Sequence, residues 1–170
     1  MTRPPFDPPT DDDLRKASIQ LGRPVRDVVG VSARCVCGAP TVLSTKPRLT
    51  DGTPFPTFYY LSHPAATAAV STLEAEGRMP QLAALLESEH GDAYRAAHEG
   101  YLADRAQFGE VPEIDGISAG GMPERVKCLH ALVAHSLAAG PGVNPIGDIA
   151  LAECSWSPEV CRCPDYAAAP

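Results

Sequence analysis

The residues of this sequence best suited to chemistry are thiols and imidazoles. The segment RCVCGAP contains Cys35 and Cys37, which are separated by one residue. The segment KCLHALVAH contains Cys128, His130 and His135. Thiolates and imidazoles are the ligands that zinc prefers, and thiolate-rich sites also suit iron–sulfur clusters. The two segments therefore indicate a transition-metal site, with zinc favoured and an iron–sulfur cluster as the alternative.

The spacing of these residues limits which of them can share an ion. Residues two apart in an extended strand are separated by about 6.6 Å, so we expect Cys35 and Cys37 to bind one ion only where the backbone turns, and Gly38 favours such a turn. On a helical wheel, Cys128 and His135 fall on the side opposite the apolar stripe of the helix, away from the core. They lie within about 20° of each other and about 10 Å apart along the axis, so they converge only on an ion between them. The expected metal ligands are Cys35, Cys37, Cys128, His135 and His130. A thiol of the C-terminal segment is the alternative fourth ligand if that segment folds back.

From a regular helix Cys128 and His130 cannot both reach one ion, because residues two apart face different directions.

The remaining cysteines have simpler interpretations. A free cysteine is often only a small buried side chain, which is the alternative for Cys128 and the expectation for Cys154. Cys161 and Cys163 stand in an irregular segment, and their role stays open.

A second kind of site uses the glycine-rich segment SAGGMP, which leads into the helix expected over residues 123–139. Free backbone N–H groups at a helix start favour an anion such as phosphate. The expected anion-binding residues are Ser118, Gly120, Gly121, Arg125 and Lys127. The segment is not a P-loop, because it lacks the closing Gly-Lys-Ser/Thr of that motif.

Whether the chain is an enzyme is left open by the sequence. Cys128 is a candidate nucleophile, but His135 is too far along the same helix to act on it directly. Tyr101 and Arg105 share one helix face with His98, and that face is either part of a site or solvated surface. The candidate catalytic residues are Cys128, His135, His98 and Glu124.

The elements that must position these residues form an α+β fold, mainly helical with a small antiparallel sheet made of a hairpin plus one strand. Thr10 precedes three aspartates and is expected to cap the first helix. His63 precedes a proline and is expected to be an exposed cap of the second. Strands are predicted over 25–32, 41–45 and 58–61, with both thiols of the first pair at the hairpin tip. Helices are predicted over 11–21, 64–76, 80–90, 92–108, 123–139 and 149–153.

Length and composition favour one packed domain. The chain has 170 residues, of which 44% are hydrophobic and 21% charged, close to the globular average. We expect the domain over residues 10–154, between a disordered N-terminal tail over 1–9, which holds four prolines, and an irregular C-terminal tail over 155–170.

Charge and hydropathy exclude two classes of partner, nucleic acid and membranes. Fourteen Lys and Arg against 21 Asp and Glu give a net charge of −7, which repels nucleic acid and anionic membrane surfaces. No apolar run approaches the roughly 20 residues of a spanning helix, and the first residues lack the apolar stretch of a signal peptide. We therefore expect a cytoplasmic protein without membrane insertion.

Three segments carry a family resemblance: RCVCGAPTVLSTKPRLTDGTPFPTFYYLSHP, LEAEGRMP and SAGGMPERVKCLHALVAHSLAAGPGVNPIGD. They resemble the bacterial domain-of-unknown-function family 501, over about Leu21 to Asp148. Its members are small cytosolic proteins without an established activity, often encoded beside a septum-formation initiator and an exopolyphosphatase-like phosphatase. The resemblance implies a link to cell division or envelope physiology, with a protein partner there.

The resemblance also bears on the site. The residues at positions characteristic of the family are Cys35, Cys128, His130, His135, His98, Tyr101 and Arg105. Cys37 varies among relatives, which shifts weight toward a site of Cys35, Cys128 and histidines. The sequence therefore predicts a cytoplasmic protein with a Cys/His metal site. The alternatives are a Cys-dependent or phosphate-binding enzyme acting on a small phosphorylated molecule, and a non-catalytic interaction module.

Overall fold

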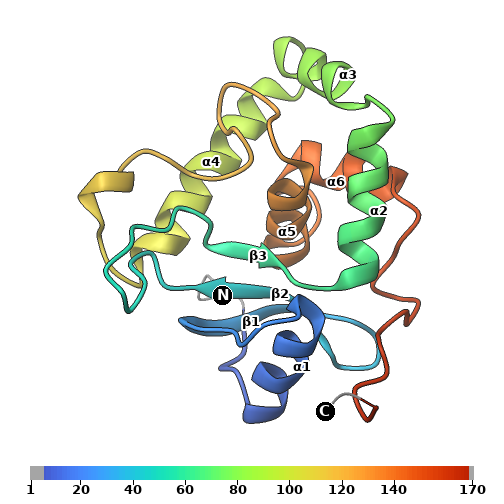
Figure 1. Ribbon diagram of the computed structural model, residues 1–170. Helices are drawn as coiled ribbons and strands as arrows, with labels where there is room; N and C mark the ends of the chain where they lie inside the picture. The colour runs from blue at the N-terminus through green and yellow to red at the C-terminus, as the bar shows by residue number, and fades with distance from the viewer. Residues whose placement is uncertain (1–5, 169–170) are drawn as a thin grey trace.

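A three-stranded antiparallel sheet lies in the middle of the structure, a computed structural model that describes residues 6–168 (Figure 1). Its strands are β1 (Val28–Arg34), β2 (Pro40–Thr45) and β3 (Tyr59–Leu61), in the order β1-β2-β3. Val31 pairs with Leu43, and Ser44 pairs with Tyr59. The hairpin and the additional strand of the sequence prediction are thus confirmed.

The central strand β2 is buried along its whole length and is covered on both faces. Successive strand residues point to opposite faces, so Val42 belongs to the main core with the helices, whereas Leu43 packs with Ala17 on the other side. Ala17 lies in α1 (Asp11–Leu21), which covers that second face (Figure 1). The α+β fold class is therefore confirmed, with the sheet between one helix and a layer of helices.

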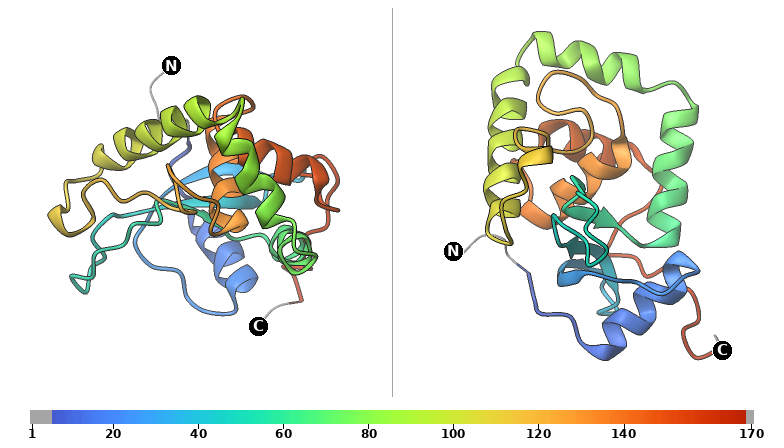
Figure 2. Two further views of the ribbon diagram at one scale, coloured as in Figure 1. Left: turned by 90° about the horizontal axis from the view of Figure 1, so that it is seen from above. Right: turned by 60° about the vertical axis from the view of Figure 1, so that its left-hand side comes forward.

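The helical layer is built around α5 (Leu129–Ala139), which lies between α2 and α4 in both Figure 1 and Figure 2. Leu132, Val133, Ala134 and His135 are all fully buried, so this helix is surrounded rather than amphipathic. The other helices are α2 (Pro64–Ala75), α3 (Met79–Ala84), α4 (Gly91–Ala106) and α6 (Pro145–Glu153), with short 3₁₀ turns at Leu85–Glu87 and Pro112–Ile114.

Two predicted helix starts are confirmed by their caps. The Thr10 hydroxyl accepts a hydrogen bond from the Asp13 N–H, and the Asp13 carboxylate accepts one from the Thr10 N–H, which completes a capping box. His63 caps α2, with Nδ1 accepting from the Ala66 N–H, but the expectation that it is exposed is wrong, since its side chain is fully buried.

The start of α5 differs from the prediction by six residues, 123 against 129. Gly120 and Gly121 both have positive φ, and the N–H groups of Lys127 and Cys128 both donate to the Gly120 carbonyl. These two hydrogen bonds close residues 120–128 into a loop. The N–H groups of Lys127 and Cys128 are therefore not free to form helical hydrogen bonds. The helix begins only after the loop, with Cys128 at its N-cap.

The first described residues pack against the sheet. Asp7 exchanges two backbone hydrogen bonds with Val31, and Phe6 packs on Phe58 and Phe108, whereas residues 1–5 of the expected tail lie outside the described residues. Residues 155–168 contain neither helix nor strand. Over residues 6–168, the structure has no helix that combines the length and the apolar character needed to cross a bilayer.

The loop before α5 generates the first prediction. Gly120 has φ +70, and a Cβ there would lie 2.5 Å from Leu132 Cδ2. We expect Gly120→Ala to lower the free energy of unfolding by about 2 to 4 kcal/mol, from the left-handed backbone and the displaced core side chain together. Urea denaturation measures it.

The matched control is Gly142→Ala. Gly142 has φ +86 but no atom within 4 Å of an added Cβ, so only the backbone cost of about 1 kcal/mol is expected. Equal losses in the two variants would show that the loop does not pack tightly on α5.

Candidate metal centre

The turn between β1 and β2 brings Cys35 and Cys37 to the same side. The Cys35 N–H donates to the Ala39 carbonyl, and the Gly38 N–H donates to the Cys35 carbonyl. Gly38 adopts φ +87, a left-handed conformation that glycine favours. The expected turn at this Cys-Val-Cys segment is therefore present.

The segment after α6 runs back along the molecule to this hairpin tip (Figure 1). The Val36 N–H donates to the Pro158 carbonyl at 2.8 Å. Further on, Gln20 of α1 donates to the Tyr166 hydroxyl at 2.7 Å, and Arg15 donates to the Tyr166 carbonyl at 2.9 Å. Because the segment has no helix or strand, these contacts and its thiols position it.

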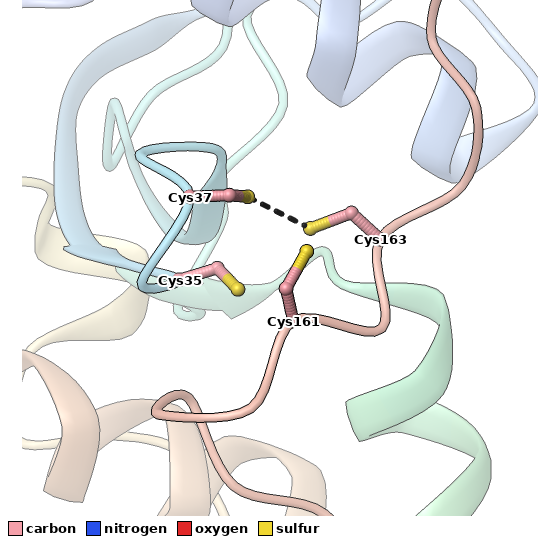
Figure 3. A group of neighbouring side chains, drawn as sticks. All are labelled: Cys35, Cys37, Cys161 and Cys163. Carbon is pink, nitrogen blue, oxygen red and sulfur yellow. Dashed lines mark hydrogen bonds between the residues drawn. The ribbon is translucent and has the colours of Figure 1, made fainter.

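Cys161 and Cys163 of this segment meet Cys35 and Cys37 (Figure 3). All four sulfurs lie within 4.8 Å of one another, and those of Cys37 and Cys163 are 3.4 Å apart. A tetrahedron of thiolates around one zinc ion has edges of about 3.8 Å, since each Zn–S bond is about 2.3 Å. Four cysteines can therefore hold one metal ion here.

His63 extends this cluster. Its Nδ1 accepts from the Ala66 N–H, so its proton lies on Nε2, which is 3.2 Å from the sulfur of Cys163. Burial lowers the pKa of His63, which favours this neutral form. The imidazole is thus oriented to donate a hydrogen bond to a thiolate, an interaction that commonly supports metal ligands.

The thiols differ in how readily they ionise. The Ala39 N–H lowers the pKa of Cys37 to about 7, whereas burial raises the pKa of Cys35 and of Cys163. Several thiolates crowded together repel one another, and a bound cation removes that cost because it binds the thiolates directly.

The structure does not bring Cys128 to this cluster. The Cys128 sulfur lies in a second group with Glu74 and His130, within 4.8 Å of one another. Cys128 and His130 come together because Cys128 precedes α5 and has extended backbone, so the helical geometry that would separate them does not apply. The hydrogen bond between this pair lowers the pKa of Cys128 and raises that of His130.

His135 belongs to neither group. It is fully buried, stacked on Tyr59 and edge-on to Tyr101, with Nδ1 3.2 Å from the Asn144 side-chain nitrogen. The helical-wheel inference that His135 faces away from the core is wrong, because α5 is buried on almost every side.

The other predicted site residues are scattered. His98 Nδ1 is 2.8 Å from the Ser118 hydroxyl, and burial lowers the pKa of His98. Arg105 is buried and donates to the carbonyls of Pro56, Ile114 and Ile117, so its face of α4 is not solvated surface.

The glycines expected to bind an anion do not form the N-terminus of α5. Gly120 and Gly121 belong to the closed loop, and Glu124, Arg125 and Lys127 are exposed. The first N–H of α5, on Leu129, donates to the Glu74 carboxylate at 2.7 Å. A carboxylate of the chain thus already lies at this helix N-terminus.

Sequence reasoning missed Glu74 and His63 as members of these groups and left Cys161 and Cys163 open. One signal was available: Cys161-Arg-Cys163 repeats the spacing of Cys35-Val-Cys37. Nothing in the spacing, however, shows that two pairs so far apart in sequence meet.

Comparison with known proteins gives one informative result. The model of the family described as a protein of unknown function, DUF501, matches residues 31–152. The match contains Cys35, Cys37 and the whole second group, but ends before Cys161 and Cys163. Neither curated proteins nor solved structures give a match.

The anchoring of the hairpin tip generates the second prediction. Arg34, next to Cys35, donates to both Asp13 carboxylate oxygens and to the Gly38 carbonyl, which braces the turn against α1. Arg34 lowers the pKa of Asp13 to about 2. Because the folded pKa lies below the unfolded value near 4, this stabilisation is present above about pH 4 and is lost as the pH falls toward 2.

We therefore expect Asp13→Asn to cost about 1 to 2 kcal/mol at pH 6 and much less at pH 2.5, measured by urea denaturation at both pH values. Asp12→Asn, whose side chain is half-exposed on the same helix, serves as control and should change stability less. A loss for Asp13→Asn that is the same at both pH values would contradict an ionic origin.

Proposed function

Because the chain belongs to this family of unknown function, DUF501, its role has to be inferred from its own sites, and we propose that it is a zinc-binding protein. Its ligands are Cys35, Cys37, Cys161 and Cys163. The observation that carries the proposal is the convergence of two Cys-x-Cys pairs, from the β1–β2 turn and the C-terminal segment, on one point.

The sulfur spacing favours a single ion over an iron–sulfur cluster. In a cluster the thiolates bind different irons, which holds the sulfurs farther apart than one shared ion does. Mutual distances within 4.8 Å fit one tetrahedral centre. Zinc is the natural occupant, because it accepts four thiolates in this geometry without redox chemistry.

Such a site is structural rather than catalytic. Four protein ligands fill a tetrahedral shell, so no position remains for water or substrate. Its role is to fasten residues 158–166 to the hairpin tip, where the chain has few other contacts. His63 does not bind the ion but supports the site, because its Nε2–H donates a hydrogen bond to the Cys163 sulfur.

Metal analysis tests the proposal. Protein purified without an affinity tag is expected to contain about one tightly held equivalent of zinc, which Cys37→Ser and Cys163→Ser each reduce to a small fraction. Replacement by cobalt should give the intense near-ultraviolet absorption of four cobalt–thiolate bonds. Cys154→Ser, at a half-buried thiol outside both groups, is the matched control and should retain the metal.

Metal content that both serine variants leave unchanged would exclude this site. A disulfide between Cys37 and Cys163 in freshly purified protein, seen by mass spectrometry before and after reduction, would likewise exclude a four-thiolate centre.

Removal of the metal provides a separate prediction. A strong chelator should lower Tm by about 5 °C or more, since the binding free energy contributes to folding. It should also open the chain after residue 157 to limited proteolysis, because that segment has no helix or strand of its own. Cleavage at the same rate with and without chelator would show that the ion does not hold the segment.

A further inference from the structure

The second group of ligands lies where α2 meets the start of α5. Thr67, Ser71 and Glu74 recur at the spacing of one helix face on α2. That face lies against Cys128, the N-cap of α5, and His130 in its first turn. The group shares no residue with the four-thiolate centre.

The contacts of His130 fix its tautomer. Its Nε2 lies 3.2 Å from the Thr67 carbonyl, which can only accept a hydrogen bond, so Nε2 carries the proton. The Ser71 hydroxyl lies 3.0 Å from the same nitrogen. In its neutral form the ring therefore presents the lone pair of Nδ1 to the rest of the group. A histidine whose other nitrogen donates to a carbonyl is the usual arrangement of a metal ligand.

The carboxylate is held in the same way. Glu74 Oε1 accepts a hydrogen bond of 2.7 Å from the Leu129 N–H, which orients it toward His130 and Cys128. Three electron-rich atoms, an imidazole nitrogen, a carboxylate oxygen and a sulfur, then face one another within 4.8 Å. Without a metal ion, the two acceptors are held together by a proton on Nδ1 of His130, and a divalent cation can take the place of that proton.

The distances between the three ligand atoms also suit a shared ion. Nδ1 of His130 is 3.4 Å from Glu74 Oε1 and 3.9 Å from the Cys128 sulfur. A direct charge-assisted hydrogen bond between nitrogen and oxygen is shorter, about 2.7 to 2.9 Å. The edges of a tetrahedron around zinc are about 3.3 Å between N and O and about 3.6 Å between N and S. The two measured distances are therefore close to the edges of one coordination shell, and the third pair of atoms lies within 4.8 Å.

We propose that Glu74, Cys128 and His130 form a second site for a divalent transition metal, zinc or a metal of similar preference. One thiolate and one carboxylate balance the two charges of the ion, and the imidazole is neutral. All three residues are half-buried, so solvent reaches the group, and a fourth position is left for water or a small anionic ligand. This is the open arrangement of sites where zinc polarises a bound molecule, in contrast to the closed four-thiolate centre.

Metal titration under anaerobic conditions tests the proposal. Wild-type protein is expected to bind two equivalents of cobalt or zinc, the second more weakly. Cys128→Ser and His130→Ala should each bind one equivalent and keep the absorption of the four-thiolate cobalt centre. Cys163→Ser should lose that absorption and keep the weaker equivalent. Glu76→Gln, an exposed residue two positions from Glu74, is the matched control and should bind two.

A measurement on the unaltered protein guards against variants that fold poorly. Alkylation of Cys128 by iodoacetamide at neutral pH, followed by mass spectrometry, should slow at least fivefold when zinc is added beyond the first equivalent. Alkylation of Cys154 should not change.

Two results would overturn this site while leaving the first one intact. One is a single equivalent in wild-type protein that Cys163→Ser abolishes. The other is rapid alkylation of Cys128 that zinc does not slow, which would identify the pair as a thiolate and imidazolium sharing a proton. If instead the four-thiolate centre does not exist, the Cys163→Ser variant should bind as much cobalt as wild-type protein and show the same absorption.

Discussion

Burial of strand β2 on both faces is the constraint on which the rest of the structure depends. All six of its residues are buried, so one helix must cover the face of Leu43 and a helical layer must cover the face of Val42. The turn that precedes β2 lies at the end of this sandwich, and Cys37 in it stays exposed. An irregular segment can reach that end without displacing core residues.

Features encoded within a few residues were predictable from the sequence. The capping box of Thr10 and Asp13, the turn at Gly38 and the strand pairing around it all follow from local rules. The start of α5 was not, because residues 123–128 have a helical pattern while their backbone groups bond within a loop. The meeting of two cysteine pairs depends on the path of the whole chain, which no local pattern encodes.

The sequence correctly predicted a helix around His135 but wrongly placed this residue on the side away from the core. The wheel assigned one apolar stripe to α5, but a helix enclosed on nearly all sides also buries its polar residues, which then pack with aromatic rings such as Tyr59. Because the middle of α5 is enclosed, polar side chains from another helix meet it at its end. Cys128 and Glu74 meet at such an end.

Cys37 and Cys163 are 126 positions apart in the sequence, so they are synthesised at different times. A ribosome completes the hairpin thiols first and must synthesise every helix of the main layer before their partners appear. During that interval the early pair has an incomplete ligand set. Delivery of an ion to the proposed centre is therefore a late event in biogenesis.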